Sequence, residues 1–87
     1  DKAAVAALHK SERLRDALIA DDAALTKFIA QFPDVNVQEV RQLIRNARKE
    51  AEGNKPPKSA RALYKLIYAM VLPPIVLEAT EEKNDEE

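Results

Sequence analysis

The placement of proline and glycine constrains this chain more than any other feature. Its 87 residues contain five prolines and a single glycine: Pro33, Pro56, Pro57, Pro73, Pro74 and Gly53. A proline lacks the amide hydrogen that a helix interior uses, and it pushes the preceding residue away from helical angles, so each proline site predicts a helix boundary. The intervening stretches are rich in Ala, Leu, Lys, Glu and Arg, a composition typical of helices. We therefore expect an all-α fold, a small bundle of about four helices.

Apolar residues that recur every three or four positions predict an amphipathic helix in each of the first two segments. Nothing breaks a helix between Lys2 and Ala20, where the apolar stripe comprises Ala4, Ala7, Leu8, Ser11, Leu14 and Leu18. Asp21 or Asp22 is placed to cap a short second helix that should end before Pro33. The apolar side of this second helix comprises Leu25, Phe28, Ile29 and Phe32.

Two further helices are predicted on either side of the first proline pair. Asp34 or Asn36 should cap the third helix, and Gly53 is placed to end it as a left-handed C-cap. The apolar stripe of this helix comprises Val37, Val40, Ile44, Ala47 and Ala51. Ser59 should cap the fourth helix, which is expected to run from Ala60 to about Leu72 and to stop at the second proline pair. Its apolar side comprises Leu63, Ile67 and Met70.

The length and charge distribution predict one domain followed by a tail. We assign the domain to residues 1–77, because a chain of this size forms a single core. Residues 78–87 include six acids and one lysine, a composition that predicts a disordered acidic tail. The longest uncharged run, Leu66 to Leu77, is too short to span a bilayer and is broken by Pro73-Pro74. We therefore expect a soluble protein, and the absence of cysteine excludes a disulfide framework.

Positive charge is concentrated between Arg41 and Lys65. This stretch holds eight cationic and two acidic residues, although the whole chain has a net charge of −1. Arg41, Arg45 and Arg48 follow helical spacing and predict an arginine edge beside the apolar stripe. Arginine binds phosphate through two parallel hydrogen bonds and stacks on unpaired bases, so this edge is a candidate contact for nucleic acid. The alternative is a solvated face with internal pairs, such as Arg48 with Glu52.

The loop after the third helix strengthens the nucleic-acid interpretation. Lys55 and Lys58 flank the stiff Pro-Pro pair, and Ser59 opens a helix whose free amide hydrogens favour an anion. The simpler interpretation, that the prolines only break the helix and the lysines only aid solubility, leaves the concentration of charge unexplained. The predicted RNA-binding residues are Arg41, Arg45, Arg48, Lys49, Asn54, Lys55, Lys58, Ser59, Arg61 and Lys65.

No catalytic site, metal site or cofactor is predicted. The Gly53 to Ser59 stretch is not a phosphate-cradling nucleotide loop, because a second glycine is absent and two prolines remove amide hydrogens. His9 is the only histidine, and with Glu12 it forms at most half of a metal site, since stable sites need three or four ligands. Tyr64 and Tyr68 are suitable for stacking on bases, but we assign them first to the edge of the core.

A family resemblance rests on two segments. The sequence LIRNARKEAEGNKPPKSARALYKLI, Leu43 to Ile67, strongly resembles the most characteristic segment of the dual-action ribosomal maturation protein family, DarP (formerly YjgA). HKSERLRDALI, His9 to Ile19, is similar to the helix that precedes it in that family. The resemblance covers most of Ala6 to Ile67 and corresponds to the C-terminal half of family members.

The resemblance implies an all-helical, cytoplasmic bacterial protein without catalytic activity. It implies association with late precursors of the large ribosomal subunit near the intersubunit face, together with other assembly factors. Promotion of peptidyl transferase centre maturation is also implied. No membrane and no small-molecule substrate are expected among the partners.

Two functions therefore remain open from the sequence. The first is a non-enzymatic ribosome biogenesis factor that binds ribosomal RNA (rRNA) through the ten residues named above. The alternative is a helical protein-interaction module, in which Leu66 to Leu77 and the apolar faces of the first two helices dock a partner or the missing N-terminal half. A helix-turn-helix DNA binder fits less well, because that motif uses a shorter connection. The acidic tail is a candidate to fold back on the basic face.

Overall fold

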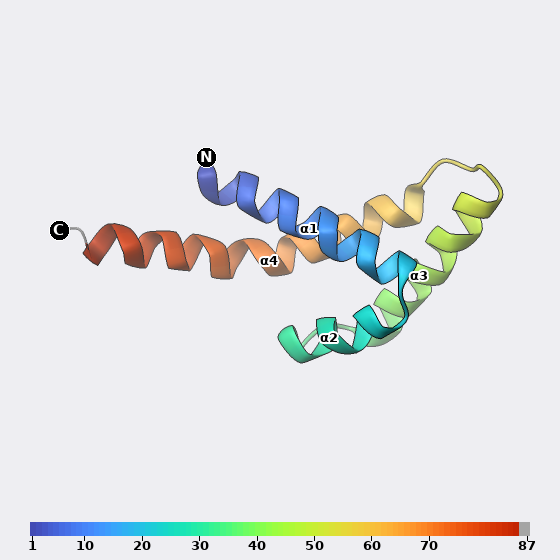
Figure 1. Ribbon diagram of the computed structural model, residues 1–87, viewed down its shortest axis with the longest axis horizontal. Coiled ribbons are helices and arrows are strands. Elements are labelled where there is room, and N and C mark those ends of the chain that lie inside the picture. The colour runs from blue at the N-terminus through green and yellow to red at the C-terminus, as the bar shows by residue number, and fades with distance from the viewer. Residues whose placement is uncertain (86–87) are drawn as a thin grey trace.

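The computed structural model describes the backbone of residues 1–85 and the surroundings of the side chains of residues 1–80. This part of the chain forms four α-helices, α1 (Lys2–Ala20), α2 (Ala23–Gln31), α3 (Val37–Glu52) and α4 (Lys58–Asp85) (Figure 1). No strand occurs within residues 1–85. The predicted all-α bundle of four helices is confirmed.

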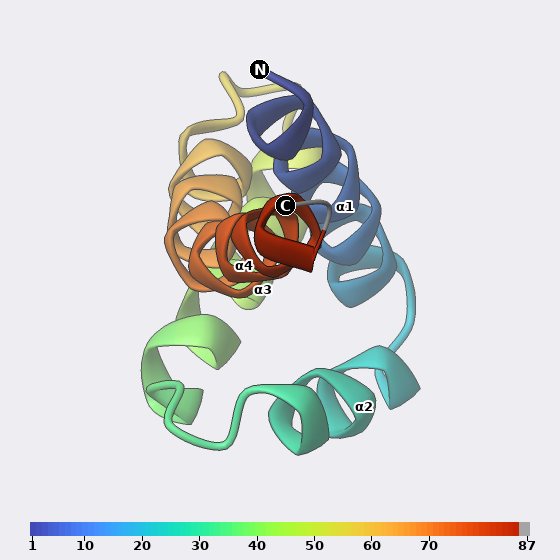
Figure 2. The same cartoon turned by 90° about the vertical axis from the view of Figure 1, so that its left-hand side faces the viewer.

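Helix α4 is the central element of the bundle. It lies against α1, which runs in the opposite direction, and α3 packs on it from another side (Figures 1 and 2). Helix α2 lies apart from α4 and contacts mainly α1. The later part of α4 extends beyond the other helices, so the molecule is elongated along this helix (Figure 1).

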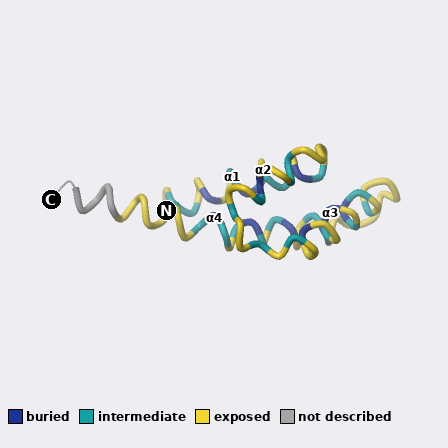
Figure 3. Tube along the Cα trace, turned by 90° about the horizontal axis from the view of Figure 1, so that it is seen from below, coloured by how far each residue is buried: buried dark blue, intermediate teal, exposed yellow. Residues whose placement is uncertain are grey.

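The core forms where the buried stripes of the helices meet. Leu63, Ile67 and Val71 of α4 are at most 1 % exposed and recur every four residues, which keeps them on one side of the helix. The other core residues are Ala7, Leu18, Phe28, Val40, Ile44 and Ala47, and Figure 3 marks the buried positions along the Cα trace. Burying one large aliphatic or aromatic side chain contributes about 1.5–3 kcal/mol, so these few residues carry much of the stability.

The caps predicted for the N-termini of α2 and α3 are present, but the cap predicted for the C-terminus of α3 is not. The side chain of Asp21 accepts a hydrogen bond from the Ala23 amide at 3.0 Å, and that of Asn36 accepts one from Glu39 at 3.1 Å. The prediction of Gly53 as the left-handed C-cap is wrong, since its φ is −90°. Asn54 takes that role with a φ of 53°, and asparagine is one of the few residues that tolerates it.

The second proline pair does not end α4. The prediction of a stop near Leu72 is wrong, because the helix runs through Pro73 and Pro74 to Asp85. Proline has a φ compatible with a helix, and its cost is the loss of hydrogen bonds to the carbonyls of Ala69 and Met70. Ala69 and both prolines are exposed, so water can reach the freed Ala69 carbonyl where α4 leaves the bundle.

The continuity of α4 bears on three other expectations. A separate acidic tail at residues 78–87 stays a prediction based on charge. The backbone is helical up to Asp85, where disorder was expected, and Glu86 and Glu87 lie outside the described residues. The end of α4 at Asp85 lies far from the loop after α3 (Figure 1), so the described part of the tail, residues 78–85, does not fold back toward that loop. By length and composition alone, the helical segment Lys58–Thr80 could cross a membrane. The prediction that the apolar run is too short to span a bilayer is therefore no longer supported.

Candidate nucleic-acid interface

The ten predicted RNA-binding residues divide between two surfaces and one loop. Four of them line a groove between α2 and α3, namely Arg41, Arg45, Arg48 and Lys49. Three line shallow hollows at the start of α4, namely Lys58, Arg61 and Lys65. Asn54 and Lys55 are exposed in the connecting loop, whereas Ser59 is buried.

The groove between α2 and α3, here the α2–α3 groove, combines an apolar floor with a mixed rim. Its volume is about 600 Å³, and its floor includes Leu18, Leu25, Ile29 and Ile44. The exposed cations at its rim are Arg41, Arg45 and Lys49, and the acids Asp22 and Glu52 also line it. Because acids are interspersed, the positive field of this groove is weaker than the number of its cations indicates.

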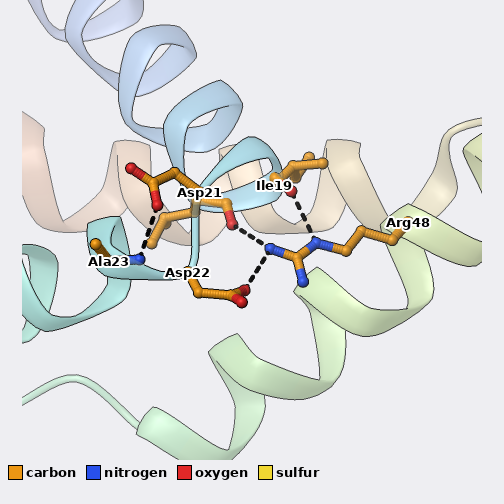
Figure 4. A network of polar contacts seen from close by, with 6 residues as sticks. Ile19, Asp21, Asp22, Ala23 and Arg48 are labelled. Atoms are coloured by element: carbon orange, nitrogen blue, oxygen red, sulfur yellow. Dashed lines mark hydrogen bonds and ion pairs between the residues drawn. The ribbon is translucent and has the colours of Figure 1, made fainter.

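Arg48 holds α3 against the end of α1. Its Nε donates a hydrogen bond to the Ile19 carbonyl at 2.7 Å, and Nη2 donates to the Leu18 carbonyl at 3.4 Å and pairs with Asp22 Oδ1 at 2.9 Å (Figure 4). The last carbonyls of a helix have no partner within the helix, and they favour a cation. Arg48 therefore caps α1 from another helix, and its acidic partner is Asp22 rather than Glu52.

Replacing the Arg48 guanidinium should destabilise the protein. Arg48→Met keeps an apolar stem but leaves the α1 carbonyls without a charged donor, so we expect the free energy of unfolding to fall by about 1–3 kcal/mol. Urea unfolding followed by circular dichroism measures this change. The matched control is Arg45→Met, which alters an exposed side chain of the same groove and should change stability by less than about 0.5 kcal/mol. Equal losses in the two variants would contradict the capping role.

Ser59 is tied to α3 by two hydrogen bonds. Its amide donates to Glu50 Oε1 at 2.9 Å and its hydroxyl donates to Glu50 Oε2 at 2.6 Å. Because α4 begins at Lys58, Ser59 lies within the first turn, and its prediction as the N-cap is wrong. The carboxylate of Glu50 occupies the start of α4, where the sequence favoured an external anion.

The Glu50–Ser59 link makes stability depend on pH. Hydrogen bonds from the Ser59 side chain and then from its amide lower the pKa of Glu50 below its ordinary value of 4.5. A carboxyl whose pKa is lower in the folded state stabilises the fold above its unfolded pKa, and that contribution is lost as pH falls through the folded pKa. We therefore expect Glu50→Gln to lose less stability than the wild type between neutral pH and pH values below 4.5.

Urea unfolding at a series of pH values tests this expectation. Glu52→Gln is the matched control, since Glu52 is an exposed acid two residues further along α3. It should keep the pH dependence of the wild type. Parallel curves for the wild type and Glu50→Gln would show that the link does not contribute.

The start of α4 carries the second surface, here the α4 basic face, formed by Arg15, Lys58, Arg61 and Lys65. Lys58, Arg61 and Lys65 are exposed along about 10 Å of helix. With Pro56, Pro57 and Ala62 they line a hollow of about 320 Å³. An adjoining hollow of about 400 Å³ is lined by Arg15, Pro57, Ala60, Arg61, Tyr64 and Lys65. Neither lining includes an acid, in contrast to the α2–α3 groove.

Arg15 is the residue of this surface that sequence reasoning missed, whereas Tyr64 was noted as suitable for stacking but assigned first to the edge of the core. Arg15 lies on α1, and its guanidinium carbon is 5.8 Å from the centre of the Tyr64 ring. Tyr68 packs against the core cluster, whereas Tyr64 is not among the residues that do so. Both tyrosines are half-buried, and Tyr68 packs on the core cluster. Helical spacing pairs the tyrosines, but it does not reveal that α1 brings an arginine to one of them.

No candidate metal site adds to this surface. Within the residues that the structure describes, no group of three or more His, Cys, Asp or Glu side chains is arranged to hold a metal ion. His9 is exposed on α1.

These features define a class: a small four-helix protein with a cation-rich face beside a proline-stiffened loop. Residues 1–68 match the model of the family described as "Dual-action ribosomal maturation protein DarP". The chain belongs to this family, which confirms the resemblance noted in its sequence. Residues 69–87, which include the projecting part of α4, lie beyond the match.

Several proteins named dual-action ribosomal maturation protein DarP are similar to this chain. That of Burkholderia ambifaria is 57 % identical over 67 residues, covering 77 % of this chain and 34 % of the relative. The protein from Cupriavidus metallidurans is 56 % identical over 66 residues, or 76 % and 33 % of the two chains. That of Nitrosomonas eutropha is 49 % identical over 64 residues, or 74 % and 36 %. The chain thus spans about a third of the length of these relatives, and no solved structure matches it.

Proposed function

We propose that this chain is a non-enzymatic ribosome biogenesis factor that binds the rRNA of late large-subunit precursors through the α4 basic face. Membership of a family of ribosomal maturation proteins supports this role. The choice of surface rests on four cations from α1 and α4. They line hollows that have no acid among their lining residues, and one of them, Arg15, also pairs with Asp16. A cytoplasmic location accompanies the proposed ribosomal partner.

Physical considerations favour a phosphate backbone as the ligand of this face. Affinity for nucleic acid comes largely from cations that neutralise phosphates and release counterions. The α4 basic face is also preorganised, because the prolines restrict the loop and Glu50 fixes Ser59 at the start of α4. A surface that is already ordered loses less conformational entropy when it binds.

The other residues predicted to bind RNA have weaker contacts or structural roles in this proposal. Arg41, Arg45 and Lys49 share the α2–α3 groove with two acids, so we assign them a weaker contribution. Lys55 extends the positive region through the loop, with Asn54 setting its backbone path. Arg48 and Ser59 act within the fold. Contact near the intersubunit face and promotion of peptidyl transferase centre maturation complete the proposal, and they rest on the resemblance alone.

Co-sedimentation with separated ribosomal subunits and large-subunit precursors tests the proposal. We expect selective association with large-subunit particles, with a log–log dependence on salt of about −0.7 per phosphate neutralised on single-stranded RNA. Association with neither particle, or affinity that does not change with salt, would contradict it.

A second candidate function is docking of a protein partner, as the sequence also allowed. The apolar floor of the α2–α3 groove and the exposed Val76 and Leu77 of α4 favour it. Because the chain spans about a third of its relatives' length, the remainder of a longer protein is one such partner. Association that is insensitive to salt but lost on substitution of the groove floor would favour this function over RNA binding.

A further inference from the structure

We propose that the hollow between α1 and the start of α4 is a binding site for an unpaired RNA nucleobase. This inference rests on the proposed function. It adds a contact with a nucleobase to the phosphate contacts of the α4 basic face. It assigns roles to Arg15 and Tyr64, which lie outside the ten residues that the sequence predicted.

The hollow has the composition that a nucleobase site requires. It measures about 400 Å³, and its lining combines flat or apolar groups with cations: Tyr64, Pro57, Ala60, Arg15, Arg61 and Lys65. Proteins that bind single strands pair aromatic rings, which stack on bases, with cations that follow the backbone. A base inside a paired helix has both faces covered by its neighbours, so such a site selects loops, bulges and single strands.

Tyr64 is half-buried and is not among the residues that pack on the core cluster. Tyr68, one turn further along α4, packs on the core cluster, and its ring centre lies 5.9 Å from that of Tyr64. On the α1 side, the guanidinium carbon of Arg15 is 5.8 Å from the Tyr64 ring centre. Asp16 pairs with the same guanidinium at 3.0 Å. The hollow is thus bordered by two planar groups that bases stack on, a tyrosine ring and an arginine fork.

The adjoining charges fit the backbone of the same nucleotide. Arg61 and Lys65 are exposed and lie one helical turn apart, about 6 Å along the axis. They border the hollow from α4 while Arg15 borders it from α1. A base that enters the hollow therefore brings its flanking phosphates within reach of cations.

Binding of two matched oligomers tests the site. Fluorescence anisotropy would compare an oligouridine with an abasic ribose-phosphate oligomer of the same length. We expect the wild type to prefer the oligouridine by roughly tenfold, since each stacked base contributes about 1–3 kcal/mol. Tyr64→Leu should abolish the preference without changing affinity for the abasic oligomer, and Tyr64→Phe should retain it.

Circular dichroism checks whether Tyr64→Leu still folds. A second variant tests the site without changing Tyr64. Arg15→Lys preserves the charge but removes the planar fork, so it should lower the preference for the oligouridine over the abasic oligomer. Equal affinity of the wild type for both oligomers, or full preference in Tyr64→Leu and Arg15→Lys, would overturn the nucleobase site while RNA binding stands. Binding of neither oligomer would overturn the proposed function together with this site.

Discussion

Reversal of two cations on the α4 basic face should largely abolish binding to large-subunit precursor RNA. For Arg61→Glu combined with Lys65→Glu, we expect an affinity loss of at least roughly 100-fold at moderate salt, because two charged hydrogen bonds of about 1.5–3 kcal/mol each are lost. The log–log salt slope should become shallower by about 1.4, which corresponds to two phosphate contacts. Filter binding or anisotropy at several salt concentrations measures both quantities.

The controls for this variant separate the site from the overall charge. Lys2→Glu with Lys27→Glu changes the net charge equally at exposed positions of α1 and α2, and it should cost little affinity. Arg41→Glu with Arg45→Glu places the same change at the α2–α3 groove. If the groove variant abolished binding and the α4 variant did not, the RNA surface would have been assigned to the wrong helix.

Arg48 must be left out of such a charge-reversal series. Charge and spacing alone place it beside Arg45 as an RNA contact, and a reversed side chain there would abolish binding for the wrong reason. Its guanidinium bonds the carbonyls of Leu18 and Ile19, so a glutamate would set a negative charge against the negative end of α1. The loss would then report damage to the fold.

Truncation of Phe28 should be the most destabilising single change among the residues that hold α2. Phe28 is 1 % exposed and is the only buried residue of α2, and its ring centre lies 5.1 Å from that of Phe32. We expect Phe28→Ala to lower the free energy of unfolding by about 3–5 kcal/mol. In a domain whose total stability is of order 5–15 kcal/mol, urea unfolding should show a large shift in midpoint.

Ile29→Ala is the matched control for this prediction. Ile29 is the next residue of α2 but is only half-buried, on the floor of the α2–α3 groove, and its truncation should cost less than half as much. Similar small losses for both variants would show that Phe28 does not anchor α2. Because α2 is remote from the α4 basic face, RNA binding by the folded fraction should persist.

Helix positions and two of the caps could be predicted because they depend on neighbours in the sequence. Asn36 caps α3 through Glu39, three residues away, and the apolar stripe of α4 places Leu63 and Ile67 in the core. Expectations failed where a local signal was permissive. Proline is compatible with helical φ, so whether Pro73 ends α4 depends on whether the freed carbonyls reach water.

The sequence by itself determined the four-helix pattern, the basic stretch from Arg41 to Lys65 and membership of the DarP family. Only the tertiary structure decided which cations face solvent. Arg48 is held by a carbonyl 29 residues away, and Arg15 reaches Tyr64 from another helix. The physical reason is that helix periodicity is a local property, whereas the hydrogen-bond partner and exposure of a side chain depend on how distant helices pack.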